Sequence, residues 1–407
     1  MRRSAPFPVL FFASAAHGMN HVLLTLYATL VLVVGQEWHV SYNTLAALWL
    51  PGAMLLGIGA PFAGWLGDRW GETRVLVLCF LALGIAAMLA GCARTPLELE
   101  GALALLGLAG SIYHPVGIAW VVKHAELRGR AIASTGIAGS IGVAIGPIAA
   151  GGLASLISWR AGFIIPGALT VALGIIFYIY YATGRIADRK GDAVTTHIQP
   201  SRSDMTRAFA VLAVTMTVTL VIYAAFDIAL PKLIDTGTNI GRYGFFAIGL
   251  AAGSIHLLGA SAQFAGGHFA DRGQAKLAYM GGFLFLACAV PLLAYAQGWA
   301  LAAALVAIVF LLEWLAPIET MFLARFTPAN RRGLVFGVRY GLAAIGNPAG
   351  VWLVSWLYNP QNGFFYLFAA LGGLSVVALA FATFIPAGSG EALPVGAEPG
   401  ALLTAEE

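Results

Sequence analysis

Charged side chains are scarce in this chain of 407 residues. Asp, Glu, Lys and Arg make up 10% of it, whereas hydrophobic residues make up 60%. A soluble domain carries about a quarter charged residues, so this chain has too little polar surface to cover a globule in water. The composition excludes a soluble protein and indicates an integral membrane protein whose surroundings are a lipid bilayer. The net charge of +4 gives no reason to expect nucleic acid as a partner.

Cysteine is also rare, with only Cys79, Cys92 and Cys288 in the chain. An odd number without paired spacing gives neither a disulfide framework nor a metal motif. We expect these side chains to be buried small hydrophobes. No nucleophile–base set, nucleotide-binding loop or cofactor motif is present either. We therefore predict neither an enzyme nor a protein with a bound cofactor.

Long apolar runs are abundant, and many have the roughly 20 residues that a helix needs to cross a bilayer. They fall at about 7–34, 44–67, 73–93, 97–123, 130–158, 161–183, 207–234, 242–269, 275–296, 300–325, 332–357 and 363–385. We predict an all-α integral membrane protein with twelve transmembrane helices in two pseudo-symmetric six-helix bundles, 1–183 and 207–385. A cytoplasmic linker, 184–206, joins them. The tail 386–407 is rich in Gly, Pro, Ala and Glu, and we expect it to be disordered.

The distribution of Lys and Arg predicts the orientation. With twelve spans, the loops on the side of the termini hold 17 of the 22 Lys and Arg residues. The opposite side holds Arg94, Arg160, Lys232 and Arg242, and Arg339 lies inside a span. The positive-inside rule then places both termini in the cytoplasm. We expect a multi-pass protein of the cytoplasmic (inner) membrane of a bacterium.

Similar segments recur in the two predicted bundles. GWLGDRWG at 64–71 is repeated as GGHFADRG at 266–273, and RGRAIAS at 128–134 as RRGLVFG at 331–337. GVAIGPIAAGG at 142–152 has a weaker counterpart in GLAAIGNPAG at 341–350. The offsets are nearly constant, which indicates an internal duplication.

These segments resemble those of major facilitator superfamily transporters, over essentially the whole chain up to Pro386. Gly64-x-x-x-Asp68-Arg69-x-Gly71 is similar to the superfamily's loop motif between helices 2 and 3, which locks the cytoplasmic side. The resemblance implies a gating role for Asp68 and Arg69 and, by repetition, for Asp271 and Arg272. Glu72 and Thr73 replace two cations that are usual in the motif, so its basic end is weakened.

A second resemblance concerns the direction of transport. Gly142, Gly146 and Pro147, followed by Gly151 and Gly152, resemble the helix 5 motif associated with exporters. The final glycine pair is displaced by one residue. The resemblance implies a helix-packing role for Gly142, Gly146 and Pro147 in an exporter.

A narrower resemblance, to the fosmidomycin-resistance branch of efflux proteins, lies in AHGMNH on helix 1 and GSIYHPVG on helix 4. Where that branch has acids, this chain has His21 and Val116, and Tyr113 conservatively replaces an aromatic residue. The branch's substrate therefore cannot be transferred to this chain, although the position of its pocket can be.

Polar side chains inside helices 1 and 4 mark a candidate substrate site. His17 and His114 each lie about nine residues from the cytoplasmic end of their helix, about 14 Å deep at 1.5 Å per residue. His21 is one turn from His17, Asn20 is adjacent, and Tyr113 precedes His114. Because intramembrane ionisable groups normally face a bundle interior or a cavity, we predict that these residues line a substrate cavity. A packing role is the alternative. The histidines could also bind a transition metal, but without a nearby carboxylate or thiolate we do not predict a metal site.

The second bundle carries acids at comparable positions. Asp227 lies on helix 7, and Glu313 lies near the middle of helix 10; neither has a cation at an obvious matching depth. A buried carboxyl group of this kind favours its neutral form, which suits a proton carrier. Glu319 and Arg339 lie at similar depth, so we predict a buried pair with a structural or gating role. We interpret His256 as a packing group.

Together these features predict a proton-coupled antiporter that exports a small organic molecule by alternating access, with protons as the second partner. Uptake by a proton-coupled symporter is the alternative. A transport-inactive membrane sensor is less well supported, because it would need an added soluble domain. We expect a monomer.

Overall fold

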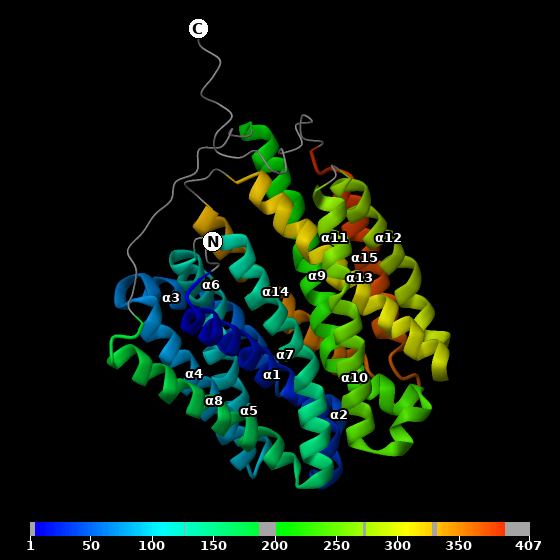
Figure 1. Ribbon diagram of the computed structural model, residues 1–407. Helices are drawn as coiled ribbons and strands as arrows, with labels where there is room; N and C mark the ends of the chain where they lie inside the picture. Colours follow the sequence, from blue (N-terminus) through cyan, green and yellow to red (C-terminus); the bar gives the residue numbers. More distant parts are fainter. Residues whose placement is uncertain (1–4, 126, 187–200, 272–273, 328–331, 387–407) are drawn as a thin grey trace.

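A computed structural model describes residues 5–125, 127–186, 201–271, 274–327 and 332–386. Only the backbone is described for residues 128, 129, 270, 271, 324 and 332–340. Within these ranges the chain is almost entirely helical, and the helices run roughly along one common direction (Figure 1).

The helices of the first half are α1 (Phe7–Trp38), α2 (Tyr42–Ala47), α3 (Leu50–Trp70), α4 (Glu72–Cys92), α5 (Pro96–Gly110), α6 (Tyr113–His124), α7 (Arg128–Leu156) and α8 (Trp159–Ala182). Those of the second half are α9 (Arg202–Gly237), η1 (Asn239–Tyr243), α10 (Phe245–Ala260), α11 (Ala262–Asp271), α12 (Ala275–Leu292), η2 (Leu293–Tyr295), α13 (Gly298–Arg325), α14 (Arg332–Leu357) and α15 (Phe365–Ala382).

Several spans consist of two helices in line because the sequence interrupts the helical hydrogen bonding. Pro51 lies at the start of α3 and Pro115 in the first turn of α6. Proline has no N–H to donate to the preceding turn, so the helix is broken before each of them. In a membrane, such a break is tolerated where the freed groups lie inside the protein. His114 lies directly after the break between α5 and α6.

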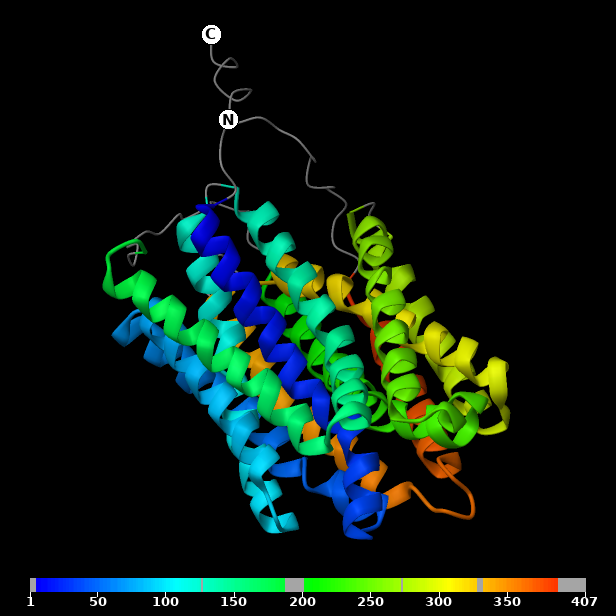
Figure 2. The same cartoon turned by 60° about the horizontal axis from the view of Figure 1, so that its bottom comes forward.

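Eleven helical segments of the described chain are long and apolar enough to cross a membrane, and α14 supplies a shorter apolar stretch, Gly341–Leu357. These eleven helices and the shorter stretch of α14, counted in the described residues, agree with the twelve spans predicted from the sequence. Figures 1 and 2 show α1 to α8 on one side and most of the second-half helices on the other, with α14 behind the helices of the first half. The predicted fold of two six-helix bundles is confirmed.

Glycines allow helices to approach closely at the centre of the molecule. A methyl group on Gly142 of α7 would overlap the carbonyl oxygen of Gly18 on α1, and one on Gly146 would overlap Thr25. On another face of α7, Gly249 of α10 abuts the carbonyl of Pro147. The helix 5 motif therefore packs α7 against α1 within the first half and against α10 across the two halves.

The halves are joined at the end opposite to the start of α1 and the end of α15, which we call the far end. Asn43 of α2 donates its amide to the carbonyls of Ser355 and Tyr358, both at 2.8 Å. The Tyr42 hydroxyl donates to the carbonyl of Ile228 at 3.0 Å. The main-chain N–H of Phe246 in α10 also donates to the hydroxyl of Ser155 in α7 at 3.0 Å. We call the other end, where α1 starts and α15 ends, the terminal end. The molecule is therefore closed at the far end.

Candidate functional site

A cavity of about 200 Å³ lies between the two halves. The first half contributes side chains of α1 and α7, and the second half contributes side chains of α9, α10, α11 and α13. The lining residues are His17, His21, Gly136, Gly139, Ser140, Val143, Tyr223, His256, Ala260, Gln263 and Glu313. The histidine wall, defined by His17 and His21, thus faces an acidic wall that contains Glu313.

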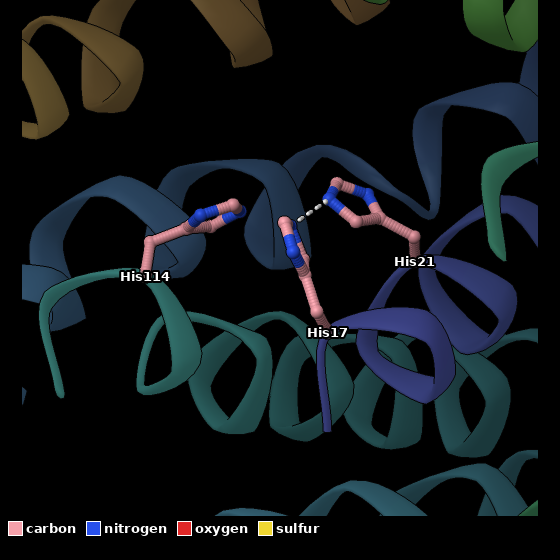
Figure 3. A group of neighbouring side chains, drawn as sticks. All are labelled: His17, His21 and His114. Carbon is pink, nitrogen blue, oxygen red and sulfur yellow. Dashed lines mark hydrogen bonds between the residues drawn. The ribbon is translucent and has the colours of Figure 1, made fainter. Parts of the chain in front are cut away.

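The histidine wall is continued by His114 of α6 (Figure 3). The ring of His114 lies edge-on to His17 and tilted against His21, with ring centroids 5.2 and 5.4 Å apart. The Nε2 atoms of His17 and His21 are 3.2 Å apart. The predicted proximity of helix 1 and helix 4 histidines is therefore present, and nitrogen atoms of all three rings lie within 4.8 Å of one another.

The ring of His17 is fixed on three sides. Its Nδ1–H donates to the carbonyl oxygen of Thr135 at 2.8 Å, and the ring of Tyr113 stacks on it at 4.5 Å and 23°. A methyl group on Gly139 would come within 2.6 Å of the ring. Because Nδ1 carries the donated proton, Nε2 of neutral His17 is an acceptor, and His21 donates to it.

On the acidic wall, Glu313 is held by Gln263, which donates its side-chain amide to the carboxylate at 2.7 Å. Gln263 comes from α11, and Tyr223 of α9 lines the same cavity. In the described part of the chain, no Lys or Arg nitrogen lies within 4.0 Å of Glu313.

Asp227 lies one turn after Tyr223 on α9 and contacts a histidine. Its Oδ1 atom is 3.7 Å from Nε2 of His256, with side chains 25% and 6% exposed respectively. Nδ1 of His256 has no hydrogen-bond partner among the described residues. His256 therefore links Asp227 to the cavity, because it lines the cavity while Asp227 does not. The packing role that the sequence predicts for His256 stays a prediction.

Asn20 and Tyr113 were predicted as cavity residues together with the histidines. Both side chains are fully buried, and neither lines the cavity. Tyr113 supports His17 through ring stacking. Asn20 has no hydrogen-bond partner for its amide group within the described chain. These two residues lie behind the wall.

Of the predicted gating residues, Asp68 and Arg69 end α3 at the terminal end, and both are exposed. The guanidinium of Arg69 lies 5.7 Å from the ring centroid of Trp65. The two residues that replace the motif's usual cations, Glu72 and Thr73, each contact α6. Glu72 forms a salt bridge with Lys123. Thr73 accepts a hydrogen bond from the indole N–H of Trp120 at 2.9 Å. The loop is therefore anchored within the first half.

Glu319 is buried and accepts hydrogen bonds from the hydroxyl of Thr219 at 2.8 Å and from that of Tyr279 at 3.1 Å. This carboxylate therefore ties α13 to α9 and α12. The side chains of Arg339 and Asp271 lie outside the described residues, as does Arg272, so the predicted Glu319–Arg339 pair and the second-half gate remain predictions.

Sequence reasoning did not single out Tyr223 or Gln263. The four-residue spacing between Tyr223 and Asp227 places them on one face of a helix, and this was the available signal. Gln263 stands two residues after Ser261, at the break between α10 and α11. A polar residue beside a break in a span is a signal for a cavity wall.

Comparison with known proteins agrees with this architecture. The chain is 27% identical over 354 residues to the multidrug resistance protein MdtG of Proteus mirabilis, covering 84% of this chain and 85% of the relative. It is 23% identical over 393 residues to the benzoate transport protein of Acinetobacter baylyi, covering 86% and 82%.

A solved structure has the same fold. It is a bacterial homologue of the human lysosomal transporter Spinster, in an inward-facing and occupied conformation. The TM-score is 0.71 at 13% identity, and the superposition covers 95% of each chain. The sequence profile of the Major Facilitator Superfamily matches residues 9–312. With its two six-helix bundles and the cavity between them, this chain belongs to the major facilitator superfamily of transporters.

Proposed function

We propose that the protein is a proton-coupled antiporter that exports a small organic molecule across the inner membrane of a bacterium, with both termini in the cytoplasm. The observation that carries the proposal is the cavity between the halves, with histidines on one wall and an acid on the other. A central site at the interface of two repeats is what alternating access by rocking requires. The site lies within one chain, which suits a monomer.

The size of the cavity limits the substrate. Its volume of about 200 Å³ is below the roughly 300–1,000 Å³ of pockets for drug-sized ligands. The imidazoles of His17 and His21 offer hydrogen bonds from the first half, and Glu313 offers an acceptor from the second. A molecule of few heavy atoms with a polar group at each end fits this arrangement. The multidrug resistance and benzoate transport relatives support an organic substrate.

The assignment of export rests on two supports. The Gly142, Gly146 and Pro147 motif packs α7 against both halves, and relatives are named for drug resistance. With the termini in the cytoplasm, the closed far end faces outward, and we propose that this state is inward-facing and able to load cytoplasmic substrate.

Flux through proteoliposomes tests the proposal. Compounds that raise the melting temperature of the purified protein, screened from antibiotics and small organic acids including benzoate, are loaded into vesicles with an imposed proton gradient. Export predicts movement of the compound against the direction of proton flow, reported by a pH-sensitive dye. Movement together with protons would instead establish the symporter, and movement that ignores the gradient would refute proton coupling.

A further inference from the structure

The histidine triad, His17, His21 and His114, places three ring nitrogens around one point beside the cavity (Figure 3). Two rings come from successive turns of α1, and the third comes from α6 just after the break in its span. The ring nitrogens lie within 4.8 Å of one another. The sequence around these histidines has no carboxylate or thiolate that could serve as a ligand. The structure nevertheless brings together three neutral imidazole nitrogens, which are enough for a three-ligand metal site.

The spacing between His17 and His21 fits two ligands of one metal ion. Zinc–imidazole bonds of about 2.0–2.1 Å at a tetrahedral angle place the two nitrogens about 3.3 Å apart. The Nε2 atoms of these histidines are 3.2 Å apart, which is at the long limit for a hydrogen bond. The pair therefore has the separation of co-ligands. Metal binding requires His21 to carry its proton on Nδ1 instead of Nε2, and His114 must approach by a further ångström or so.

The surroundings of His17 are those of a metal ligand. Metal-binding histidines almost always donate their other ring N–H to a carbonyl or carboxylate, which fixes the tautomer and the orientation of the ring. His17 donates Nδ1–H to the carbonyl of Thr135 at 2.8 Å, so its Nε2 lone pair points into the triad. Tyr113 stacks on the ring and Gly139 makes room for it.

We propose that His17, His21 and His114 bind one divalent transition-metal ion of the zinc, cobalt or nickel type. Imidazole nitrogen suits these ions, whereas calcium and magnesium require oxygen ligands. Because His17 and His21 line the cavity, the fourth coordination position is open to it, as in zinc sites that bind water or a substrate atom. Three neutral ligands leave the ion's charge uncompensated, so an anionic oxygen donor in the cavity would complete the site.

Metal binding is measured on the purified full-length protein without a histidine tag and without a proton gradient, so the result does not depend on the transport proposal. Cobalt(II) is the spectroscopic probe, and zinc is added in competition. We expect one cobalt ion per chain with the intense visible bands of tetrahedral geometry, displaced by zinc. Loss of an outer-shell group typically weakens metal binding 10- to 100-fold, so His17→Gln, His21→Gln and His114→Gln should each weaken it by at least about tenfold. His268→Gln, at an exposed histidine outside the cavity, should leave the affinity unchanged.

A ligand exchange keeps the test decisive if a glutamine variant unfolds. His21→Cys should retain cobalt and add a sulfur-to-cobalt charge-transfer band that the wild type lacks, because the thiolate enters the coordination sphere. A folded wild-type protein that binds no cobalt or zinc saturably would overturn the site. Equal binding by wild type and all three glutamine variants, or His21→Cys protein with bound cobalt and no new band, would overturn it as well.

Discussion

The two walls of the cavity differ in how their polar groups are held. On the histidine wall, His17 is fixed by a backbone carbonyl, an aromatic ring and a close helix contact, so its direction is set by groups that do not titrate near neutral pH. On the acidic wall, Glu313 is held by the side chain of Gln263. A rigid wall suits recognition, whereas a wall of mutually bonded side chains can rearrange when a proton arrives.

From this contrast we propose separate roles for the two halves. We assign substrate binding to His17, His21 and His114, and proton coupling to Asp227 and Glu313. His256 lines the cavity and contacts Asp227, and so connects this acid to the cavity. If the roles are separate, variants of the two walls will fail in different assays, and the following changes test this from the largest expected effect to the smallest.

Removing the titratable acids should have the largest effect. Asp227→Asn and Glu313→Gln keep the size of each side chain but cannot gain or lose a proton, so transport driven by a pH gradient should be abolished. Counterflow exchange, which requires no net proton movement, should persist. Asp235→Asn is the control: it lies on the same helix as Asp227 but pairs with Lys232 away from the cavity. Full pH-driven transport by both acid variants would place the coupling group elsewhere.

Changes to the histidine wall should weaken binding. Loss of a hydrogen bond to a buried polar group costs about 1–3 kcal/mol, so His17→Ala or His114→Ala should weaken substrate binding roughly 10- to 100-fold. The dependence of transport on the pH gradient should survive at saturating substrate. Binding is measured by calorimetry on purified protein, with exposed His268→Ala as the control. Unchanged affinity in both wall variants would refute the assignment.

The arrangement of the walls was partly predictable from the sequence. His17 and His114 could be matched because both lie about nine residues from the same membrane surface, and helix rise converts that count into depth. Rotation about the helix axis was harder to predict. Asn20 is adjacent to His21, yet it is fully buried behind the wall. His256 looked like a packing residue because α10 is apolar on all sides, so the sequence carried no signal for the face that meets the cavity.

The twelve spans were predictable because bilayer thickness fixes helix length. The close contacts across the interface were not, because they depend on which glycine faces which helix. The exporter motif indicated packing in general, whereas the structure shows Gly142 against Gly18 and Pro147 against Gly249. These pairings arise from the relative placement of helices far apart in the chain.

Packing behind the histidine wall supplies the third prediction. Gly142→Ala would place a methyl group onto the backbone oxygen of Gly18, and overpacking of this kind costs about 1–3 kcal/mol. The melting temperature of the purified protein should fall by several degrees, at about 2–4 °C per kcal/mol. Gly136→Ala, on the same helix with no atom near the added methyl, should be neutral or slightly stabilising. Equal melting temperatures for both variants would contradict the close contact.

The smallest expected effect concerns the equilibrium between open states. The far end is closed by the hydrogen bonds of Asn43, while Asp68 at the terminal end is exposed. We predict that Asp68 docks at the start of α14 when the terminal end closes. An acid at a helix N-terminus contributes about 0.3–1 kcal/mol. Asp68→Asn should therefore shift the equilibrium between the two states roughly 1.5- to 5-fold towards the one described here, with the far end closed, and should slow turnover.

Cross-linking measures both directions of this equilibrium. In a protein whose native cysteines are replaced, one cysteine at Leu66 and one at Val335 report closure of the terminal end. Asp68→Asn should lower the cross-linking yield, because the terminal end closes less often. Asn43→Ala should raise it, because two far-end hydrogen bonds are lost and the population shifts the other way. Opposite changes of similar size would show that the two ends compete. If Asp68→Asn leaves the cross-linking yield and turnover unchanged, this aspartate is only a solvent-exposed polar residue of its loop. The gate would then depend on other residues.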